Sequence, residues 1–226
     1  MRILFVRHGN PNYELDVLTE LGHKQAEACA ERLKNEGIEK IFSSTCGRAL
    51  ETAAHTAEKY GLDVVHCDFI REISWASKDG TPIFQNGHPW FCSMEYVKEN
   101  RSLIDPDWEN DPLYAKSNTP DSFRKVSAGL DGWMESLGYK REGYYYRVVE
   151  KKYDTVAMFC HGGAFAAAFS HLFNLPAPFA FRCVPLNQSG VVEITLGGEV
   201  GELVPVQLGT SYGISHLREN GIEITP

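Results

Sequence analysis

Ile3-Leu4-Phe5-Val6-Arg7-His8-Gly9 begins with four apolar residues and follows them at once with a cation and an imidazole. A short, bounded apolar run of this kind predicts a buried β-strand. Arg7 and His8 then stand at the carboxyl end of that strand, the edge where open α/β sheets bind their ligands. Arginine suits multi-oxygen anions such as phosphate, and histidine can be a nucleophile, an acid, a base or a metal ligand. The stretch therefore predicts a buried strand with an anion site at its end.

The residues after this stretch alternate between helical and extended patterns. In chain order they predict a helix over residues 20–36, a strand over 38–43, a helix over 48–60 and a strand over 63–67. Thr19 is suited to cap the first helix, and Gly37 and Gly61 are placed to end the two helices. This β-α-β-α-β order predicts a mostly parallel sheet with helices on both faces.

The second half of the chain continues with similar elements. A helix is predicted over residues 119–137, a strand over 155–159 and a helix over 163–173. Two late strands, over 190–196 and 202–208, are predicted to form a hairpin around Gly197-Gly198.

Residues 74–118 break this alternation. They hold seven aromatic side chains and four prolines. Irregular segments of this length are usually binding loops, lids or disorder, and the aromatic content argues against disorder. We expect an insertion that partly covers a pocket, within a single domain over residues 1–226. A packed excursion without a ligand role is the alternative.

The composition narrows the possible classes of protein. The net charge is −8, which argues against a general nucleic-acid binder. No apolar run approaches the roughly 18 residues of a membrane span. Six cysteines are spread along the chain without a Cys-x-x-Cys pair, as expected for free thiols in a reducing compartment. We therefore expect a cytoplasmic protein that acts without a membrane or nucleic-acid partner.

Charged and polar side chains recur where the predicted strands end. Arg48 opens the second helix, Glu72 follows the strand over 63–67, and His161 follows the strand over 155–159. The carboxyl ends of parallel strands meet at one edge of a sheet, so we expect these side chains to project there together with Arg7 and His8.

This set of residues fits phosphoryl transfer without a metal ion, because it is rich in cations, holds one acid and lacks a carboxylate cluster. Arg7, Arg48 and His161 are expected to bind the phosphoryl oxygens. His8 is expected to attack phosphorus and form a phosphohistidine. Glu72 would protonate the departing group and then deprotonate the attacking water. Neither a metal nor another cofactor is expected.

The chain resembles the histidine phosphatase superfamily, the phosphoglycerate-mutase-like proteins. The resemblance rests on motifs in family order: Arg7-His8-Gly9, Leu18-Thr19-Glu20-Leu21-Gly22, Ser43-Ser44 with Gly47 to Ala53, Arg71-Glu72-Ile73 and His161-Gly162. It implies a three-layer α/β/α sandwich, with His8 as the phosphorylated nucleophile and Glu72 as the proton donor. Arg7, Arg48 and His161 would form the phosphate pocket, with His161 also taking part in catalysis.

The sequence also departs from the family pattern. Many relatives continue the first motif with an acid, a threonine and a later asparagine that contacts phosphate. Here Asn10-Pro11-Asn12 follows, so Asn10 or Asn12 is the candidate for that contact. The acid after Arg71 matches the phosphatase branches better than the mutases, which predicts an acid-type phosphomonoesterase acting on a small phosphorylated substrate. Mutase-type phosphoryl transfer and a non-catalytic phospho-ligand binding protein remain the alternatives.

Overall fold

The computed structural model describes residues 1–225, which divide into two compact units. The first unit contains residues 1–71, residues 131–162 and the chain from Leu186 onward, and the second contains residues 72–130 and 163–185. The two units are described separately. The expected single domain over 1–226, with an insertion at 74–118, stays a prediction.

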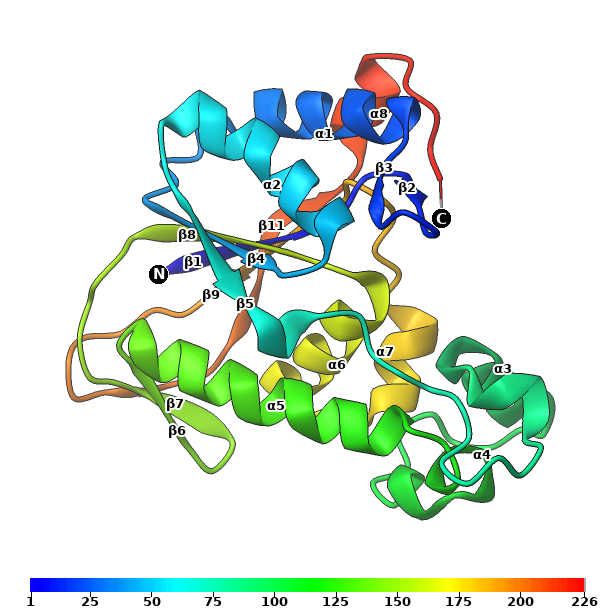
Figure 1. Cartoon of the computed structure of the whole chain (residues 1–226). Helices are drawn as coiled ribbons and strands as arrows, with labels where there is room; N and C mark the ends of the chain where they lie inside the picture. The colour runs from blue at the N-terminus through cyan, green and yellow to red at the C-terminus, as the bar shows by residue number, and fades with distance from the viewer. Residues whose placement is uncertain (226) are drawn as a thin grey trace. The chain divides into compact units, whose positions relative to one another are not determined.

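A six-stranded sheet forms the centre of the first unit (Figure 1). Its strands, in spatial order, are β11 (Gln207–Gly213), β9 (Val191–Thr195), β1 (Arg2–Arg7), β8 (Thr155–Cys160), β4 (Lys40–Ser44) and β5 (Val64–Cys67). β1, β8, β4 and β5 run parallel, whereas β9 is antiparallel to both β1 and β11. The predicted mostly parallel sheet is confirmed.

Apolar side chains on both faces of β1 explain its central position. Leu4 and Val6 are fully buried in one core cluster with side chains of the two helices α1 (Glu20–Leu33) and α2 (Gly47–Tyr60), which cover one face of the sheet (Figure 1). Phe5 points to the opposite face and meets Trp133, which lies near the end of α5 (Thr119–Ser136), with ring centroids 6.4 Å apart. The sheet is therefore flanked by helices, as the α/β class predicts.

The two helices of the first face begin and end for local reasons. Thr19 caps α1 by accepting a hydrogen bond from the Gly22 amide at 3.1 Å. α1 ends at Leu33, earlier than the predicted Glu36, because the Tyr60 hydroxyl donates to the Leu33 carbonyl at 2.5 Å and accepts from the Glu36 amide. Gly61 ends α2 in the left-handed conformation, with φ of 63°.

The predicted hairpin around Gly197-Gly198 is wrong. The next strand along the chain that pairs with β9 is β11, which begins only at Gln207. Leu203–Val204 instead forms β10, which pairs with β7 (Tyr145–Val148) in a separate sheet whose third strand is β6 (Tyr139–Glu142). Gly198 and Gly201 have positive φ and lead the chain away from β9, so residues 202–208 are shared between two sheets. The hairpin of β6 and β7 was not predicted.

Short elements complete the first unit. β2 (Pro11–Asn12) and β3 (Val17–Leu18) form a two-stranded ribbon after β1. A 3-10 turn, η1 (Asp68–Ile70), follows β5, and α8 (Ser215–Glu219) follows β11.

The second unit is helical. It holds η2 (Phe84–Gly87), α3 (Pro89–Lys98), η3 (Trp108–Asn110), α4 (Pro112–Ala115), the larger part of α5, all but the first residue of α6 (Gly162–Phe173), and α7 (Ala177–Cys183). Residues 74–118 thus contain short helices joined by irregular segments. Their rings Tyr96, Trp108 and Tyr114 are buried, so much of the aromatic content is core of this unit. A lid role for the segment stays a prediction.

Two further observations concern the described residues. Among helices placed in residues 1–225, none is both long and apolar enough to cross a membrane. All six cysteines are free, and five of them are buried.

Candidate active site

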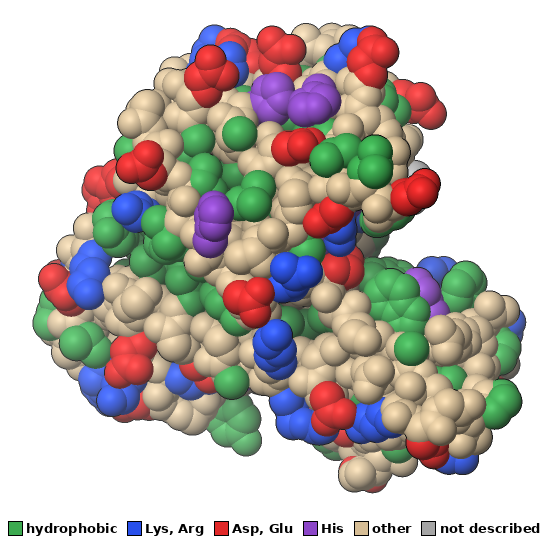
Figure 2. Space-filling view, viewed as in Figure 1, with side chains coloured by type: hydrophobic (Ala, Val, Ile, Leu, Met, Phe, Trp, Pro, Cys, Tyr) green, Lys and Arg blue, Asp and Glu red, His purple; other side chains and the backbone are tan. Residues whose placement is uncertain are grey.

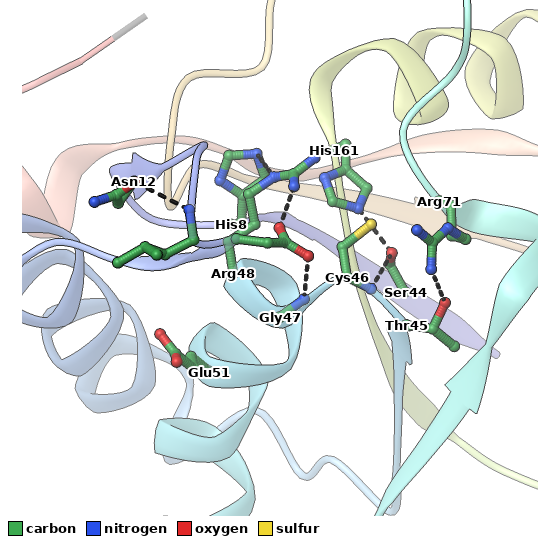
Figure 3. A network of polar contacts seen from close by, with 12 residues as sticks. His8, Asn12, Ser44, Thr45, Cys46, Gly47, Arg48, Glu51, Arg71 and His161 are labelled. Atoms are coloured by element: carbon green, nitrogen blue, oxygen red, sulfur yellow. Dashed lines mark hydrogen bonds and ion pairs between the residues drawn. The ribbon is translucent and has the colours of Figure 1, made fainter.

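Four of the predicted site residues, Arg7, His8, Arg48 and His161, come together in the first unit, and Figure 3 shows the last three. The rings of His8 and His161 lie with centroids 5.1 Å apart, because β1 and β8 are parallel neighbours. The Arg48 Nε–H donates to His8 Nε2 at 3.3 Å from the first turn of α2. The Arg7 guanidinium carbon lies 3.4 Å from where a Cβ would stand on Gly162. Two guanidinium groups and two imidazoles therefore meet at the carboxyl edge of the parallel strands.

His8 is held as a neutral ring with a defined tautomer. Its Nδ1 lies 2.7 Å from the Gly9 carbonyl oxygen, an acceptor, so Nδ1 carries the proton and Nε2 carries the lone pair. The donor Arg48 on the Nε2 side agrees with this assignment. Burial lowers the pKa of His8 to about 3, and the charges of Arg7 and Arg48 act in the same direction. A lone pair for nucleophilic attack is thus present at neutral pH.

Arg48 is fixed by an acid that the sequence did not single out. Asp16 pairs with Arg48 Nη1 and accepts a hydrogen bond from the Gly47 amide at 2.8 Å. Cys46, at the N-cap of α2, makes no side-chain cap, so Asp16 satisfies the start of this helix from a neighbouring loop. Burial acts to raise the pKa of Asp16, but hydrogen bonds from Gly47 and Arg48 outweigh it and the pKa is lowered. Asp16 therefore stays ionised and holds the guanidinium beside His8.

One ring nitrogen of His161 is hydrogen-bonded, and the other has no hydrogen-bond partner. Its Nε2 lies 2.7 Å from Ser44 Oγ, which also accepts the Cys46 amide. His161 Nδ1 and Arg7 Nε are buried and have no hydrogen-bond partner. Burial, aided by His8 and the arginines, lowers the pKa of His161 well below its usual value, so the ring is neutral. Since buried polar nitrogens are nearly always satisfied, these two mark the place of a ligand.

Further hydrogen bonds fix the Arg7 side chain and the backbone after His8. Arg7 Nη1 donates to the Leu186 carbonyl at 2.8 Å. Thr52 accepts the Gly9 amide at 3.0 Å and donates to the Arg48 carbonyl, so it ties the two strand-end motifs together.

Glu72 lies in the second unit and is anchored at the start of α6. Its carboxylate accepts hydrogen bonds from three backbone amides, those of Ala164 at 3.0 Å, Gly163 at 3.3 Å and Ile73 at 2.9 Å. A Cβ on Gly163 would stand 2.7 Å from Glu72 Oε1, so only glycine leaves room for this contact. In the chain, Gly163 follows His161 by two residues.

The two asparagines of the first loop make structural contacts. Asn10 accepts from the Thr19 hydroxyl at 2.7 Å and donates to Gln188 Oε1 at 3.2 Å. Asn12 accepts the amides of Glu14 and Leu15 in a local turn. Contact with phosphate by either asparagine stays a prediction.

Sequence reasoning missed Asp16, Ser44, Thr52 and the Gly9 carbonyl as partners of the site. Ser44 and Thr52 lie inside the quoted motifs, and that position was the available signal. Asp16 had none, because its contact depends on how the loop before α1 folds back. Within residues 1–225, no group of three or more histidine, cysteine or acidic side chains gathers as a metal centre.

Comparison with known proteins agrees with this arrangement. The sequence profile of the histidine phosphatase superfamily (branch 1) matches residues 3–207. The chain belongs to this superfamily. The resemblance predicted from the motifs is confirmed, and membership supports chemistry on phosphate esters.

Individual curated relatives match only part of this chain. The probable phosphoglycerate mutase GpmB of Yersinia pestis (strain Pestoides F) is 33% identical over 92 residues, covering 37% of this chain and 43% of the relative. The match thus spans less than half the length of that curated relative.

Solved structures share the fold over nearly the whole chain. A mycobacterial glucosyl-3-phosphoglycerate phosphatase is 22% identical with a TM-score of 0.63, covering 92% of this chain and 97% of the other. The phosphoserine phosphatase of Entamoeba histolytica, solved with 3-phosphoglyceric acid, is 19% identical with a TM-score of 0.60, covering 96% and 98%.

Proposed function

We propose that this chain is a metal-independent acid-type phosphomonoesterase that hydrolyses a small phosphate ester through a phosphohistidine at His8. One observation carries the proposal: a neutral imidazole presents the Nε2 lone pair in a buried site beside Arg48 and two unpaired polar nitrogens. A nucleophile surrounded by anion-binding donors suits attack on a phosphoryl group.

The first half-reaction transfers the phosphoryl group to the enzyme. His8 Nε2 forms a bond to phosphorus while the ester P–O bond breaks, and the departing alkoxide takes a proton from Glu72. Arg48 Nε, which donates to His8 Nε2 in the free enzyme, turns to a phosphoryl oxygen. Arg7 Nε and His161 Nδ1 donate to the other oxygens, and these donors offset the charge of the transferring group.

The Gly9 carbonyl stabilises the intermediate. Once Nε2 is bonded to phosphorus, the imidazole carries a positive charge with its remaining proton on Nδ1. The Gly9 oxygen, 2.7 Å away, accepts that proton's hydrogen bond and disperses the charge. The same contact keeps the ring oriented through both half-reactions.

The second half-reaction returns the enzyme to its starting state. Glu72 takes a proton from water, the water oxygen bonds to phosphorus and the P–N bond to His8 breaks. Inorganic phosphate leaves and His8 is again neutral. Three backbone amides donate to Glu72, a partner set that suits the carboxylate required as base in this step.

Ser44 and Asp16 act as positioning residues in this scheme. When the Ser44 hydroxyl donates to His161 Nε2, the ring proton stays on Nδ1, which becomes a donor to phosphate. Because Asp16 pairs with Nη1 of Arg48, the Nε–H of Arg48 is available to turn from His8 to a phosphoryl oxygen. Asn10 adds a contact to phosphate if its amide turns from Gln188.

Six free cysteines support a reducing, cytoplasmic location.

A panel of phosphate monoesters tests the proposal. Purified protein is assayed for phosphate release in the presence of a chelator, and 3-phosphoglycerate is also assayed for isomerisation. We expect hydrolysis that the chelator does not reduce and that exceeds isomerisation. Isomerisation exceeding hydrolysis supports the mutase alternative, which the name of the Yersinia relative favours. Tight phosphate binding without any turnover contradicts the enzyme proposal.

A further inference from the structure

The ribbon of β2 and β3 carries a short turn, residues 13–16, that is fastened at both ends. Pro11 pairs with Leu18 and Asn12 with Val17 in the ribbon. Asn12 Oδ1 accepts the amides of residues 14 and 15 at 3.0 and 3.2 Å. Asp16, at the other end, is bonded to the first turn of α2. Because both ends are held, the turn presents its side chains in a fixed position.

Two large apolar side chains of this turn are exposed. Tyr13 has 66% and Leu15 has 68% of its surface accessible. The Arg48 guanidinium carbon lies 5.4 Å from the centre of the Tyr13 ring, within the range of a cation–π contact. Arg48 itself is only 9% exposed. The ring therefore stands at the solvent side of the arginine that lies beside the nucleophile.

The charges of the turn limit what can lie against it. Glu14 is exposed between the two apolar side chains, whereas the charge of Asp16 is paired with Arg48. A second anionic group on the substrate would be repelled here, whereas an uncharged ring or alkyl group would gain contact with Tyr13 and Leu15.

We propose that Tyr13 and Leu15 form a subsite for the ester group of the substrate, and that this subsite selects monoesters whose leaving group is aromatic or apolar and bears no anion. The inference rests on the proposed function, because it takes the phosphoryl group to lie on Arg48 beside His8. An ester oxygen directed from that position toward solvent brings the leaving group to the exposed side of the Tyr13 ring.

Binding of phosphonates tests the subsite without the effect of leaving-group reactivity. Dissociation constants for phenylphosphonate, methylphosphonate and inorganic phosphate are measured by calorimetry, at a pH where both phosphonates are dianions. We expect wild type to bind phenylphosphonate about 3- to 10-fold more tightly than methylphosphonate, the range of one aromatic contact. Tyr13→Ala should remove this preference and leave phosphate binding unchanged, and Tyr13→Phe should retain it.

Tyr144→Ala is the matched control, because Tyr144 is 71% exposed on the turn between β6 and β7. It should leave all three constants unchanged. Equal binding of the two phosphonates by wild type, or a preference that survives in Tyr13→Ala, overturns the subsite while phosphate binding still supports the proposed function. If none of the three ligands binds, the proposed function fails as well.

Discussion

Two pairs of histidines in this chain have nearly the same ring geometry and very different surroundings. His8 and His161 have centroids 5.1 Å apart with planes at 58°, and His23 and His55 have centroids 5.5 Å apart at the same angle. The first pair is buried beside two arginines, and each ring has a fixed polar partner. The second pair bridges α1 and α2, where neighbouring histidines are visible at the surface (Figure 2).

The difference shows which features make a site. Proximity of the rings is common to both pairs. Only the buried pair combines neutral imidazoles, unpaired donor nitrogens and guanidinium groups. The surface pair instead lies near carboxylates, with Glu51 3.9 Å from His23. The environment therefore decides the chemistry, and the predictions below compare the two pairs.

The largest effect is expected for the nucleophile. His8→Ala should lower kcat for phosphate release by about 10⁴-fold or more, because no other group can form the covalent bond. His55→Ala, the control from the surface pair, should stay within about twofold of wild type. The measurement is steady-state hydrolysis of one monoester. Equal losses in both variants would contradict a special role for the buried pair.

The proton donor is expected to rank next. Glu72→Gln should reduce kcat by about 10²- to 10⁴-fold for alkyl esters and far less for activated aryl esters, which need no proton. Gly163→Ala, which would press a methyl group against the carboxylate, should reproduce this pattern in weaker form. Assays of both variants with leaving groups of graded basicity check the role. A loss that is the same for all leaving groups would remove Glu72 as the acid.

The buried His8 ring should also make the stability of the protein depend on pH. The pKa of His8 is about 3 in the folded protein and about 6.5 when unfolded, so the unfolded chain binds more protons between these values. The free energy of unfolding should therefore decrease as pH falls from 6.5 toward 3, by up to about 4 kcal/mol from this group. Denaturant titrations of wild type and His8→Asn measure the difference, and parallel curves would contradict the buried neutral ring.

The smallest effect is expected for the surface pair. His23→Ala should change the free energy of unfolding by about 0.5 kcal/mol or less, since exposed polar contacts are weak. Burial and the neighbouring His23 lower the pKa of His55, so removing His23 should raise it. NMR titration of the His55 ring checks the direction, and an unchanged midpoint would show that the two rings do not interact.

The sequence predicted the parts of the fold and site that follow from periodicity and strand order. The apolar run at residues 3–6 and the helix ends at Gly61 and Thr19 follow from local patterns. The meeting of Arg7, His8, Arg48 and His161 follows from these patterns plus the geometry of parallel sheets. These features depend on few long-range details.

The missed features depend on how loops fold back. Residues 202–208 have a strand pattern, but nothing in it says that Leu203 pairs with β7 and Gln207 with β9. Asp16 is an ordinary loop acid until the ribbon brings it to α2. The acceptor for His8 Nδ1 is a backbone carbonyl, which no pattern of side chains encodes.

The most direct test of the account is to trap the covalent intermediate. Enzyme mixed with a monoester and quenched in base within milliseconds should carry one phosphoryl group, and peptide mass spectrometry should place it on the His8 imidazole. His55 and His161 should carry none. A quenched enzyme without phosphate during steady turnover, or with the phosphoryl group on any other residue, would contradict the central claim that the neutral His8 ring is the nucleophile.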